Sequence, residues 1–350
     1  MPIQPAPGDS PPTDLPPADR PPPDGKSSGR KSPGGQPTPH DSVFRRFFGV
    51  PENAASELRA VLPPDLAARL DLGALDPVPG SFIDGELTSR HSDLLFKTNL
   101  DGSDAYVYLL IEHQSSNDPL MAFRMLMYMT RIWEQYLRQT PKARQLPAVI
   151  PLVVYYARKR WTAPTQMLDL INLDPAEKKA AERYLPRFEF LLDDLTRVSD
   201  SQLLDRQLPA PALMTLVIIK IAPGNRNVAA ELRKWKPQLR AVLDGPDGYQ
   251  EFIALIIYTE RVSEAPASEL HELAASLGQD AEEAYMTTAD MLRAEGRAQG
   301  RAETLVDMLT VKFGSLSDSV TQLVNGASSE QLRAWTLRTL TAETLDQVFA

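Results

Sequence analysis

Hydrophobic and polar positions recur with different periods along the chain, and the period changes at identifiable points. Apolar residues have helical spacing in a segment that begins at residues 40–41 and carries Phe44, Phe47 and Phe48. Two further short helical segments are expected at 51–62 and 64–70. The chain then becomes rich in short apolar and aromatic runs, which are typical of strands.

The strand-rich part predicts a meander. A weak strand candidate at 81–87 is followed by stronger ones at 92–98 and 105–113. The turn Asp101-Gly102-Ser103-Asp104 separates the last two, so we expect them to form an antiparallel hairpin. The segment 105–113 is almost wholly apolar, which indicates that both faces of this strand are covered.

A long amphipathic helix is expected at 120–138, and a short buried strand interrupted by Pro151 at 149–156. The order helix, three strands, helix, strand predicts an α/β core in which the fourth strand is reached by a helical crossover. Beyond Trp161 the spacing is helical throughout, so the core should be followed by an all-α C-terminal region. Its expected helices are 203–222, 227–243, 249–262 and 284–313.

Composition divides the chain further. Residues 1–39 hold 13 of the 31 prolines with little apolar mass, which predicts a disordered tail. We expect the core at 40–165, a helical extension at 166–280 and a helical C-terminal domain at 281–350.

A period-four repeat lies in the last long helix, where residues 295–303 read Glu-Gly-Arg-Ala-Gln-Gly-Arg-Ala-Glu. Small residues four apart form one stripe on a helix and permit close packing. Two interpretations stay open: a close contact, including one that makes a homo-oligomer through the C-terminal helices, or a solvated helix with alternating charge.

Charge and composition exclude several classes of protein. The net charge of −9 argues against a general nucleic-acid coat protein, although residues 40–160 balance 14 basic against 14 acidic side chains. The absence of cysteine excludes disulfides and cysteine-based zinc sites. No apolar run is long enough to span a bilayer, and the first residues show no signal pattern. We therefore expect a cytoplasmic protein with no membrane partner.

The residues that carry chemistry are Asp93 on one expected strand and Glu112-His113-Gln114 on the next. Residues i and i+2 of a strand point to the same face, so Glu112 and Gln114 project together, and the hairpin would bring Asp93 beside Glu112. Clustered carboxylates repel each other unless a cation such as Mg²⁺ joins them. The backbone carbonyl of His113 would add a ligand, and Gln114 would position a water molecule.

Residues 40–165 resemble the bacterial Rpn family of recombination-promoting nucleases, also known as YhgA-like transposases. The resemblance implies a PD-(D/E)XK restriction-endonuclease-like core, Mg²⁺-dependent cleavage of DNA, and a link to recombination or mobile elements. It makes Asp93 and Glu112 metal ligands and puts Gln114 in the place of the usual lysine. The residues from 281 to 350 also resemble a helical domain often attached to such proteins. The matching strings are His40 to Phe44, Ser92 to Phe96, Ile111 to Ser116, Met121 to Arg124 with Tyr128, Leu146-Pro147, and Pro151 to Tyr156.

Several residues have both a functional and a structural interpretation. Asp41 either approaches the site or caps its helix. Arg124 and Tyr128 share a helix face, and they either reach the cleaved phosphate or pair with a carboxylate and pack in the core. The cluster Arg158-Lys159-Arg160, with Trp161 beside it, either contacts DNA and stacks on a base or is a charged loop end.

Two functions therefore remain. The first is a Mg²⁺-dependent DNA endonuclease that hydrolyses phosphodiester bonds. The second is a protein that keeps the nuclease fold with weak or no cleavage and binds DNA or another protein. The neutral core and Gln114 favour the second somewhat.

Overall fold

The computed structural model describes residues 38–78, 94–112, 118–157 and 159–350, without the side chains of 110–112. Its strands are β1 (Asp76–Val78), β2 (Leu94–Leu100), β3 (Ser103–Glu112), β4 (Ala148–Tyr155) and β5 (Leu191–Asp194). Its helices are α1 (Pro39–Phe48), α2 (Pro51–Val61), α3 (Pro64–Ala67), α4 (Met121–Gln139), α5 (Pro175–Ala181), α6 (Asp200–Asp205), α7 (Ala210–Ile221), α8 (Val228–Leu232), α9 (Lys236–Leu243), α10 (Gly248–Val262), α11 (Ala267–Ala275), α12 (Gln279–Phe313), α13 (Asp318–Asn325), α14 (Ser329–Thr339) and α15 (Leu345–Phe349).

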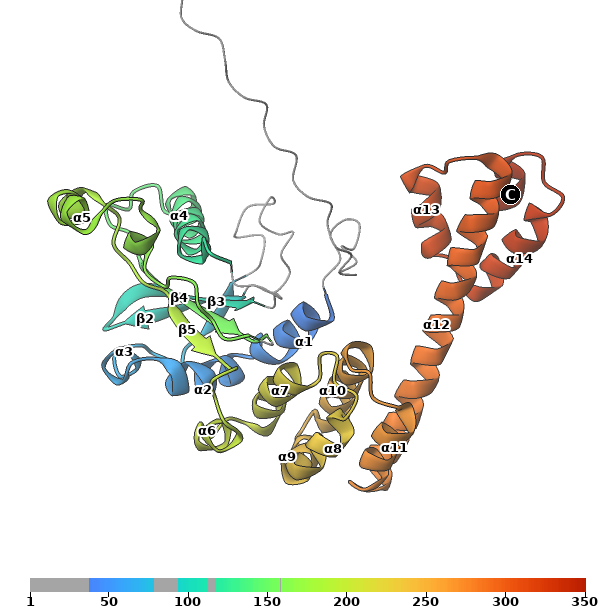
Figure 1. The fold of residues 1–350 in the computed structure, drawn as a ribbon, viewed down its shortest axis with the longest axis horizontal. Helices are drawn as coiled ribbons and strands as arrows, with labels where there is room; N and C mark the ends of the chain where they lie inside the picture. Colours follow the sequence, from blue (N-terminus) through green and yellow to red (C-terminus); the bar gives the residue numbers. More distant parts are fainter. Residues whose placement is uncertain (1–37, 79–93, 113–117, 158) are drawn as a thin grey trace, which may run out of the picture. The chain divides into compact units, whose positions relative to one another are not determined.

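The strands form one five-stranded sheet in the order β1-β2-β3-β4-β5 (Figure 1). The first three are antiparallel neighbours, whereas β3 with β4 and β4 with β5 are parallel pairs. The predicted hairpin of the second and third strands is therefore confirmed, and β1 at Asp76–Val78, which the sequence did not predict, adds a third antiparallel strand. The candidate at 81–87 lies outside the described residues. The helical crossover between β3 and β4 is α4, as predicted.

The hairpin between β2 and β3 closes through two residues. Leu100 pairs with Ser103, so Asp101 and Gly102 are the loop, and their φ angles are 49° and 84°. Positive φ at both central residues is the requirement of a type I′ turn, whose twist matches that of the strands. An Asp-Gly sequence meets this requirement with little strain, because glycine has no Cβ and Asp tolerates the left-handed region.

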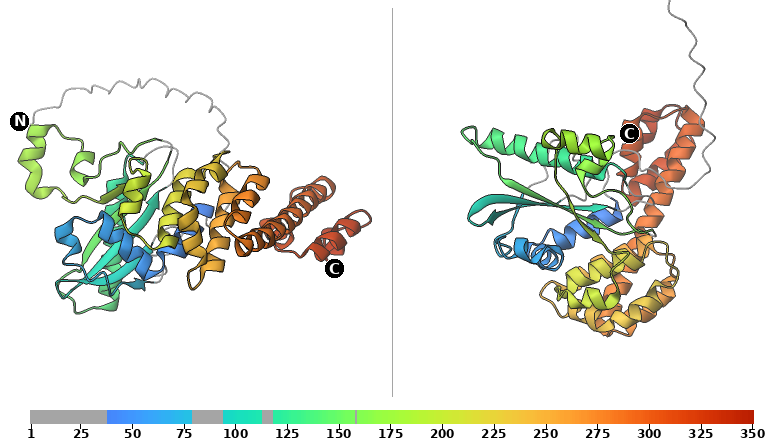
Figure 2. Two further views of the ribbon diagram at one scale, coloured as in Figure 1. Left: turned by 90° about the horizontal axis from the view of Figure 1, so that it is seen from below. Right: turned by 60° about the vertical axis from the view of Figure 1, so that its left-hand side comes forward.

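Both faces of β3 are covered, as its composition predicted (Figure 2). Ala105, Val107 and Leu109 belong to a core cluster shared with α1, α2 and α7, and Tyr106 and Tyr108 belong to a second cluster shared with α4. All five side chains are buried. Successive strand residues point to opposite faces, so an unbroken apolar run supplies two cores at once.

Pro151 lies in the middle of β4, where it pairs in register with Tyr108 of β3. Proline has no N–H group to donate to a neighbouring strand. The pairing of β4 with β5 begins only at the next residue, where Leu152 pairs with Leu191. Pro151 is therefore tolerated because, among the described strands, one side of β4 has no partner at this position.

The sheet extends further along the chain than the sequence predicted. β5 lies at Leu191–Asp194, inside the segment that we expected to be a helical extension, so the prediction of helix alone beyond Trp161 was wrong. The segment was missed because Asp193 and Asp194 interrupt its apolar run, and acidic pairs are uncommon inside strands. Both carboxylates are nevertheless buried and have partners, which are described below.

The rest of the described chain is helical, as predicted. The expected helix 203–222 is two helices, α6 and α7: Gln207, with a φ of 53°, lies between them, and Pro209 and Pro211 lie at the start of α7. Residues 290–301 of α12 include none that is buried, and no atom outside the helix lies within 4 Å of the place of a Cβ at Gly296 or Gly300. The glycines therefore serve no close contact within the described part of this chain. No described helix has the length and apolar character needed to cross a membrane.

Candidate functional site

Three parallel strands end at the same edge of the sheet. β3 ends at Glu112, β4 at Tyr155 and β5 at Asp194. Glu112 pairs in register with Tyr155, and Tyr155 pairs with Asp194, so these three residues form a row, which we call the carboxyl edge. The carboxyl ends of parallel strands are where open α/β sheets bind ligands. The carboxyl edge is therefore the candidate functional site.

Of the four residues expected at the site, the described part of the chain includes only Glu112, which lies on this edge. Glu112 is the last residue of β3, and its side chain is not among the described ones. Asp93, His113 and Gln114 lie outside the described residues. Leu94, the first residue of β2, pairs with Leu109 of β3, three positions before Glu112. The meeting of the two carboxylates stays a prediction.

A metal ion would need donors that the described residues do not gather. Among the described residues no group of three or more His, Cys, Asp or Glu side chains could hold one. The expected donors are the carboxylates of Asp93 and Glu112 with the backbone carbonyl of His113. These are all oxygen atoms, which is the donor type that Mg²⁺ prefers. In its chemistry the expected set therefore fits this cation.

The start of α1 lies beside the end of β4. Thr38 is the N-cap: its hydroxyl accepts from the Asp41 backbone N–H at 3.2 Å, and the Asp41 carboxylate accepts from the Thr38 N–H at 2.9 Å. Asp41 therefore caps the helix from its third position, and not as the N-cap that we expected. A role of Asp41 in the site stays a prediction.

His40, the residue before Asp41, joins three elements. Its Nδ1 lies 2.7 Å from the hydroxyl of Tyr258 on α10, and its ring is 5.6 Å from the ring of Tyr156, which follows β4. Burial raises the pKa of the Tyr258 hydroxyl, so this group stays protonated. Nothing in the sequence indicated this cluster, because residues 40 and 258 are far apart along the chain.

The structure gives Arg124 and Tyr128 the packing that their structural interpretation requires. Tyr128 is buried with its ring 5.1 Å from that of Tyr108 on β3. Arg124 is 7% exposed and donates to Asp118 at 2.8 Å. The other oxygen of Asp118 accepts from the Leu120 backbone N–H. Arg124 thus fixes the turn by which the chain enters α4, close after the carboxyl edge.

The basic cluster after β4 is exposed, but its aromatic neighbour is not. Lys159 and Arg160 are exposed, and Arg158 lies outside the described residues. Trp161 is 8% exposed and contacts the rings of Tyr155 and Phe190 edge to face. Of the two interpretations of this cluster, the burial of Trp161 argues against stacking on a base, because its ring is part of the core.

A buried ion cluster joins the sheet to the helices beneath it. Arg206 donates two hydrogen bonds to Asp193 of β5, at 2.7 and 2.9 Å, and one to Glu57 of α2 at 2.7 Å. Glu57 is fully buried, and one of its carboxyl oxygens has no hydrogen-bond partner among the described residues. Burial raises the pKa of Glu57 well above its usual range, and the Asp193 carboxylate raises it further.

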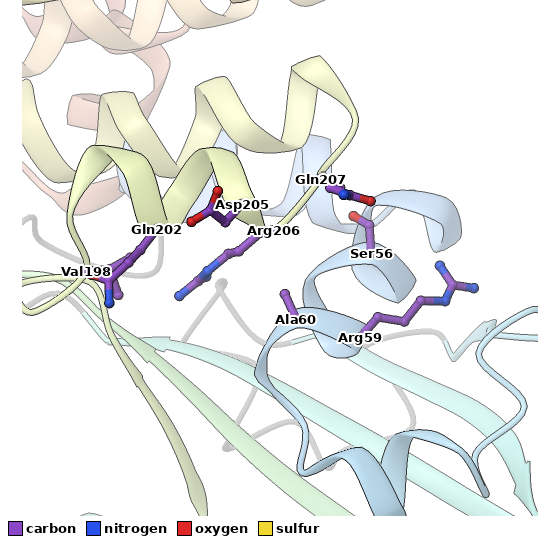
Figure 3. A pocket seen from close by; sticks show the side chains of 8 residues that line it. All are labelled: Ser56, Arg59, Ala60, Val198, Gln202, Asp205, Arg206 and Gln207. Atoms are coloured by element: carbon purple, nitrogen blue, oxygen red, sulfur yellow. The ribbon is translucent and has the colours of Figure 1, made fainter.

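The same arginine faces an open cavity of about 720 Å³ between α2 and the junction of α6 and α7. Figure 3 shows Arg206 in its wall and the Arg59 side chain across from it. Because Arg206 is bound to two carboxylates, its charge is already neutralised. We therefore do not assign an anion site to this cavity.

Comparison with known proteins gives independent evidence about the family. Residues 38–248 match the family described as "Putative transposase, YhgA-like". The chain is 33% identical over 173 residues to the recombination-promoting nuclease RpnD of Escherichia coli O157:H7, which covers 49% of this chain and 64% of RpnD. It is 30% identical over 215 residues to the recombination-promoting nuclease RpnC of Escherichia coli K12, covering 55% and 69%.

A third relative differs in its name. The inactive recombination-promoting nuclease-like protein RpnE of Escherichia coli K12 is 34% identical over 170 residues, which covers 49% of this chain and 55% of RpnE. The chain thus spans less than two-thirds of the length of RpnD and RpnE. No solved structure is significantly similar to it.

Proposed function

Because the chain belongs to the YhgA-like transposase family and is similar to recombination-promoting nucleases, we propose that it is a DNA endonuclease. Its substrate is the phosphodiester bond of DNA, its cation is Mg²⁺, and its core is of the PD-(D/E)XK type. The activity is linked to recombination or mobile elements and takes place in the cytoplasm.

The observation that carries this proposal is the course of the chain around β3. An antiparallel hairpin leads into β3, β3 ends at Glu112, and α4 then crosses over to the parallel strand β4. This order agrees with the one that the resemblance to PD-(D/E)XK nucleases implies. It leaves a carboxylate residue at the carboxyl end of a central strand, which is where open α/β sheets bind their ligands.

Asp93 and Glu112 would hold the cation together with the backbone carbonyl of His113. When bound, Mg²⁺ polarises the phosphate and lowers the pKa of the attacking water. Gln114 orients that water by hydrogen bonds, but as an amide it supplies no positive charge. A lysine at this position would stabilise the developing negative charge directly, so we expect slower cleavage than a lysine would allow.

A second function has one specific observation in its favour. RpnE is named inactive, yet it is as similar to this chain as RpnD is, at 34% against 33% identity. A protein with the same core that binds DNA or another protein without cutting is therefore the alternative.

One assay separates the two. Purified full-length protein is incubated with supercoiled plasmid, with Mg²⁺ or with EDTA, beside the variants Asp93→Ala and Glu112→Ala. The endonuclease proposal predicts Mg²⁺-dependent nicking that both variants lose. Binding without nicking supports the alternative, and nicking that persists in both variants places the activity elsewhere or in a contaminant.

A further inference from the structure

The loop after β4 is tied back to the carboxyl edge at two points. The Tyr155 hydroxyl donates to the backbone carbonyl of Lys159 at 3.0 Å, and the Asp194 carboxylate accepts from the backbone N–H of Trp161 at 3.2 Å. Tyr155 and Asp194 are the two edge residues that pair with each other in register. The edge itself therefore holds both ends of the segment 159–161.

Each of these two residues is itself fixed. Tyr155 is fully buried, and its ring lies 4.9 Å from that of Trp161. The second oxygen of Asp194 accepts from the backbone N–H and the hydroxyl of Thr196, at 3.1 and 2.6 Å. The Trp161 Nε1 donates to the Ala163 carbonyl at 2.6 Å. The loop thus has a rigid, buried base.

The two charged residues that follow Arg158 differ from this base in their exposure. Lys159 and Arg160, which we call the basic loop, are both exposed. The basic loop differs from an irregular charged loop end. The buried Trp161 ring anchors it, and the backbone of Lys159 and Trp161 is held in place by hydrogen bonds. Preorganised cations lose less conformational entropy when they bind a phosphate.

The basic loop is also close to the expected site. Glu112 pairs with Tyr155, and neighbouring strands lie about 4.8 Å apart. Lys159 is four positions after Tyr155, and four extended residue steps reach at most ~14 Å. The Lys159 backbone therefore lies within about 19 Å of Glu112, and less because it folds back. One DNA strand carries a phosphate about every 3.4 Å of helix axis, so this is a reach of a few phosphates.

We propose that Tyr155 and Asp194 are positioning residues that hold the basic loop against the phosphate backbone of duplex DNA, beside the bond to be cut. The inference rests on the proposed function, because it takes DNA as the ligand. It adds a specific partner surface and names the residues that shape it. The phosphate contact gives affinity and register, and it carries no base preference.

The test uses the Tyr155→Phe variant, which removes one hydroxyl and changes no charge. Binding of full-length protein to a fluorescein-labelled duplex is measured by anisotropy in EDTA, at several salt concentrations. The charge variant is Lys159→Gln with Arg160→Gln, and the third protein combines all three substitutions. The control for loss of a tyrosine hydroxyl elsewhere is Tyr285→Phe, because that hydroxyl likewise lies within hydrogen-bond distance of a backbone carbonyl, that of Ala267 at 2.8 Å, and also of the Glu260 carboxylate at 2.7 Å.

We expect the charge variant to bind more weakly and to reduce the slope of log K against log salt by about 1.8, the value for two phosphate contacts. Tyr155→Phe should weaken binding about fivefold, as the loss of one hydrogen bond does. Added to the charge variant it should have no further effect, because nothing remains to be positioned. Tyr285→Phe should bind like the wild type.

Two results would overturn the inference. The first is unchanged binding by Tyr155→Phe. The second is an equal loss from Tyr155→Phe in both backgrounds, which would indicate a general structural effect. Failure of the wild type to bind duplex DNA overturns the proposed function as well. Binding that behaves as described, without Mg²⁺-dependent nicking, overturns the nuclease activity alone.

Discussion

Replacing Arg206 with methionine tests how the helices are joined to the sheet. The substitution keeps most of the side-chain length and removes the cation. It leaves Glu57, which is 0% exposed, and Asp193, which is 5% exposed, without their shared partner. Removing one partner of a buried ion pair costs about 3–5 kcal/mol. We expect a loss of that size at pH 8, a large part of the roughly 5–15 kcal/mol that keeps a domain folded.

The loss should depend on pH. The folded-state pKa of Glu57 is raised, first by burial and then by Asp193, so the folded protein holds this proton more tightly than the unfolded chain. The contribution of such a carboxyl to stability is complete below its unfolded pKa of about 4.3 and is lost as the pH rises through the folded value. Without Arg206 the pKa of Glu57 rises further. The deficit of the variant should therefore be smaller at pH 5 than at pH 8.

Urea unfolding followed by circular dichroism at both pH values measures the deficit. Arg59→Met is the control, because Arg59 lines the same cavity but is exposed, and within the described residues its side chain donates one long hydrogen bond, 3.5 Å to the Leu72 carbonyl. We expect this control to stay within about 0.5 kcal/mol of the wild type. A deficit of Arg206→Met below about 1 kcal/mol, or one that is equal at the two pH values, would refute the reasoning.

Three further predictions concern parts of the chain that are independent of the ion cluster. Thr38→Ala removes the N-cap of α1 and should cost about 1 kcal/mol in urea unfolding, and an unchanged midpoint would contradict the capping box. Trp161→Ala should cost about 3–5 kcal/mol because the ring is buried, and a loss typical of a surface residue would restore the base-stacking interpretation. If α12 has no packing partner at Gly296 and Gly300, alanine at both positions should stabilise this helix by about 1 kcal/mol per site, because each Cβ would meet open space. If those glycines pack against a second copy of the chain, sedimentation velocity should instead show weaker self-association of this variant.

The parts of the fold that sequence predicted well are those governed by local rules. The β2–β3 hairpin follows from Asp101-Gly102, because few other dipeptides take positive φ at two successive residues. The double-sided burial of β3 follows from its unbroken apolar run. The helix α4 follows from the helical spacing of its apolar residues. In each case the information lies within a few residues of the element.

The parts that were missed depend on distant partners. β5 contains Asp193, which is stable inside the protein only because Arg206 neutralises it, and Glu57, 149 residues before Arg206, joins the same cluster. Nothing in the sequence near residue 193 predicts this ion cluster. The burial of Trp161 likewise depends on Phe190, whose ring contacts the indole, and on Asp194, whose carboxylate accepts from the Trp161 backbone N–H. Sequence could therefore name basic residues at the end of β4, but not the contacts that hold them.

The central claim is that residues 93 and 112 meet around one divalent cation, and iron-directed cleavage of the polypeptide tests it directly. Fe²⁺ replaces Mg²⁺ in the purified protein, ascorbate and peroxide generate radicals at the bound ion, and mass spectrometry maps the cut positions. We predict cuts near residue 93 and near residues 112–114, suppressed by excess Mg²⁺ and absent in Asp93→Ala. Cuts at only one of these segments, or at neither, would contradict the shared site.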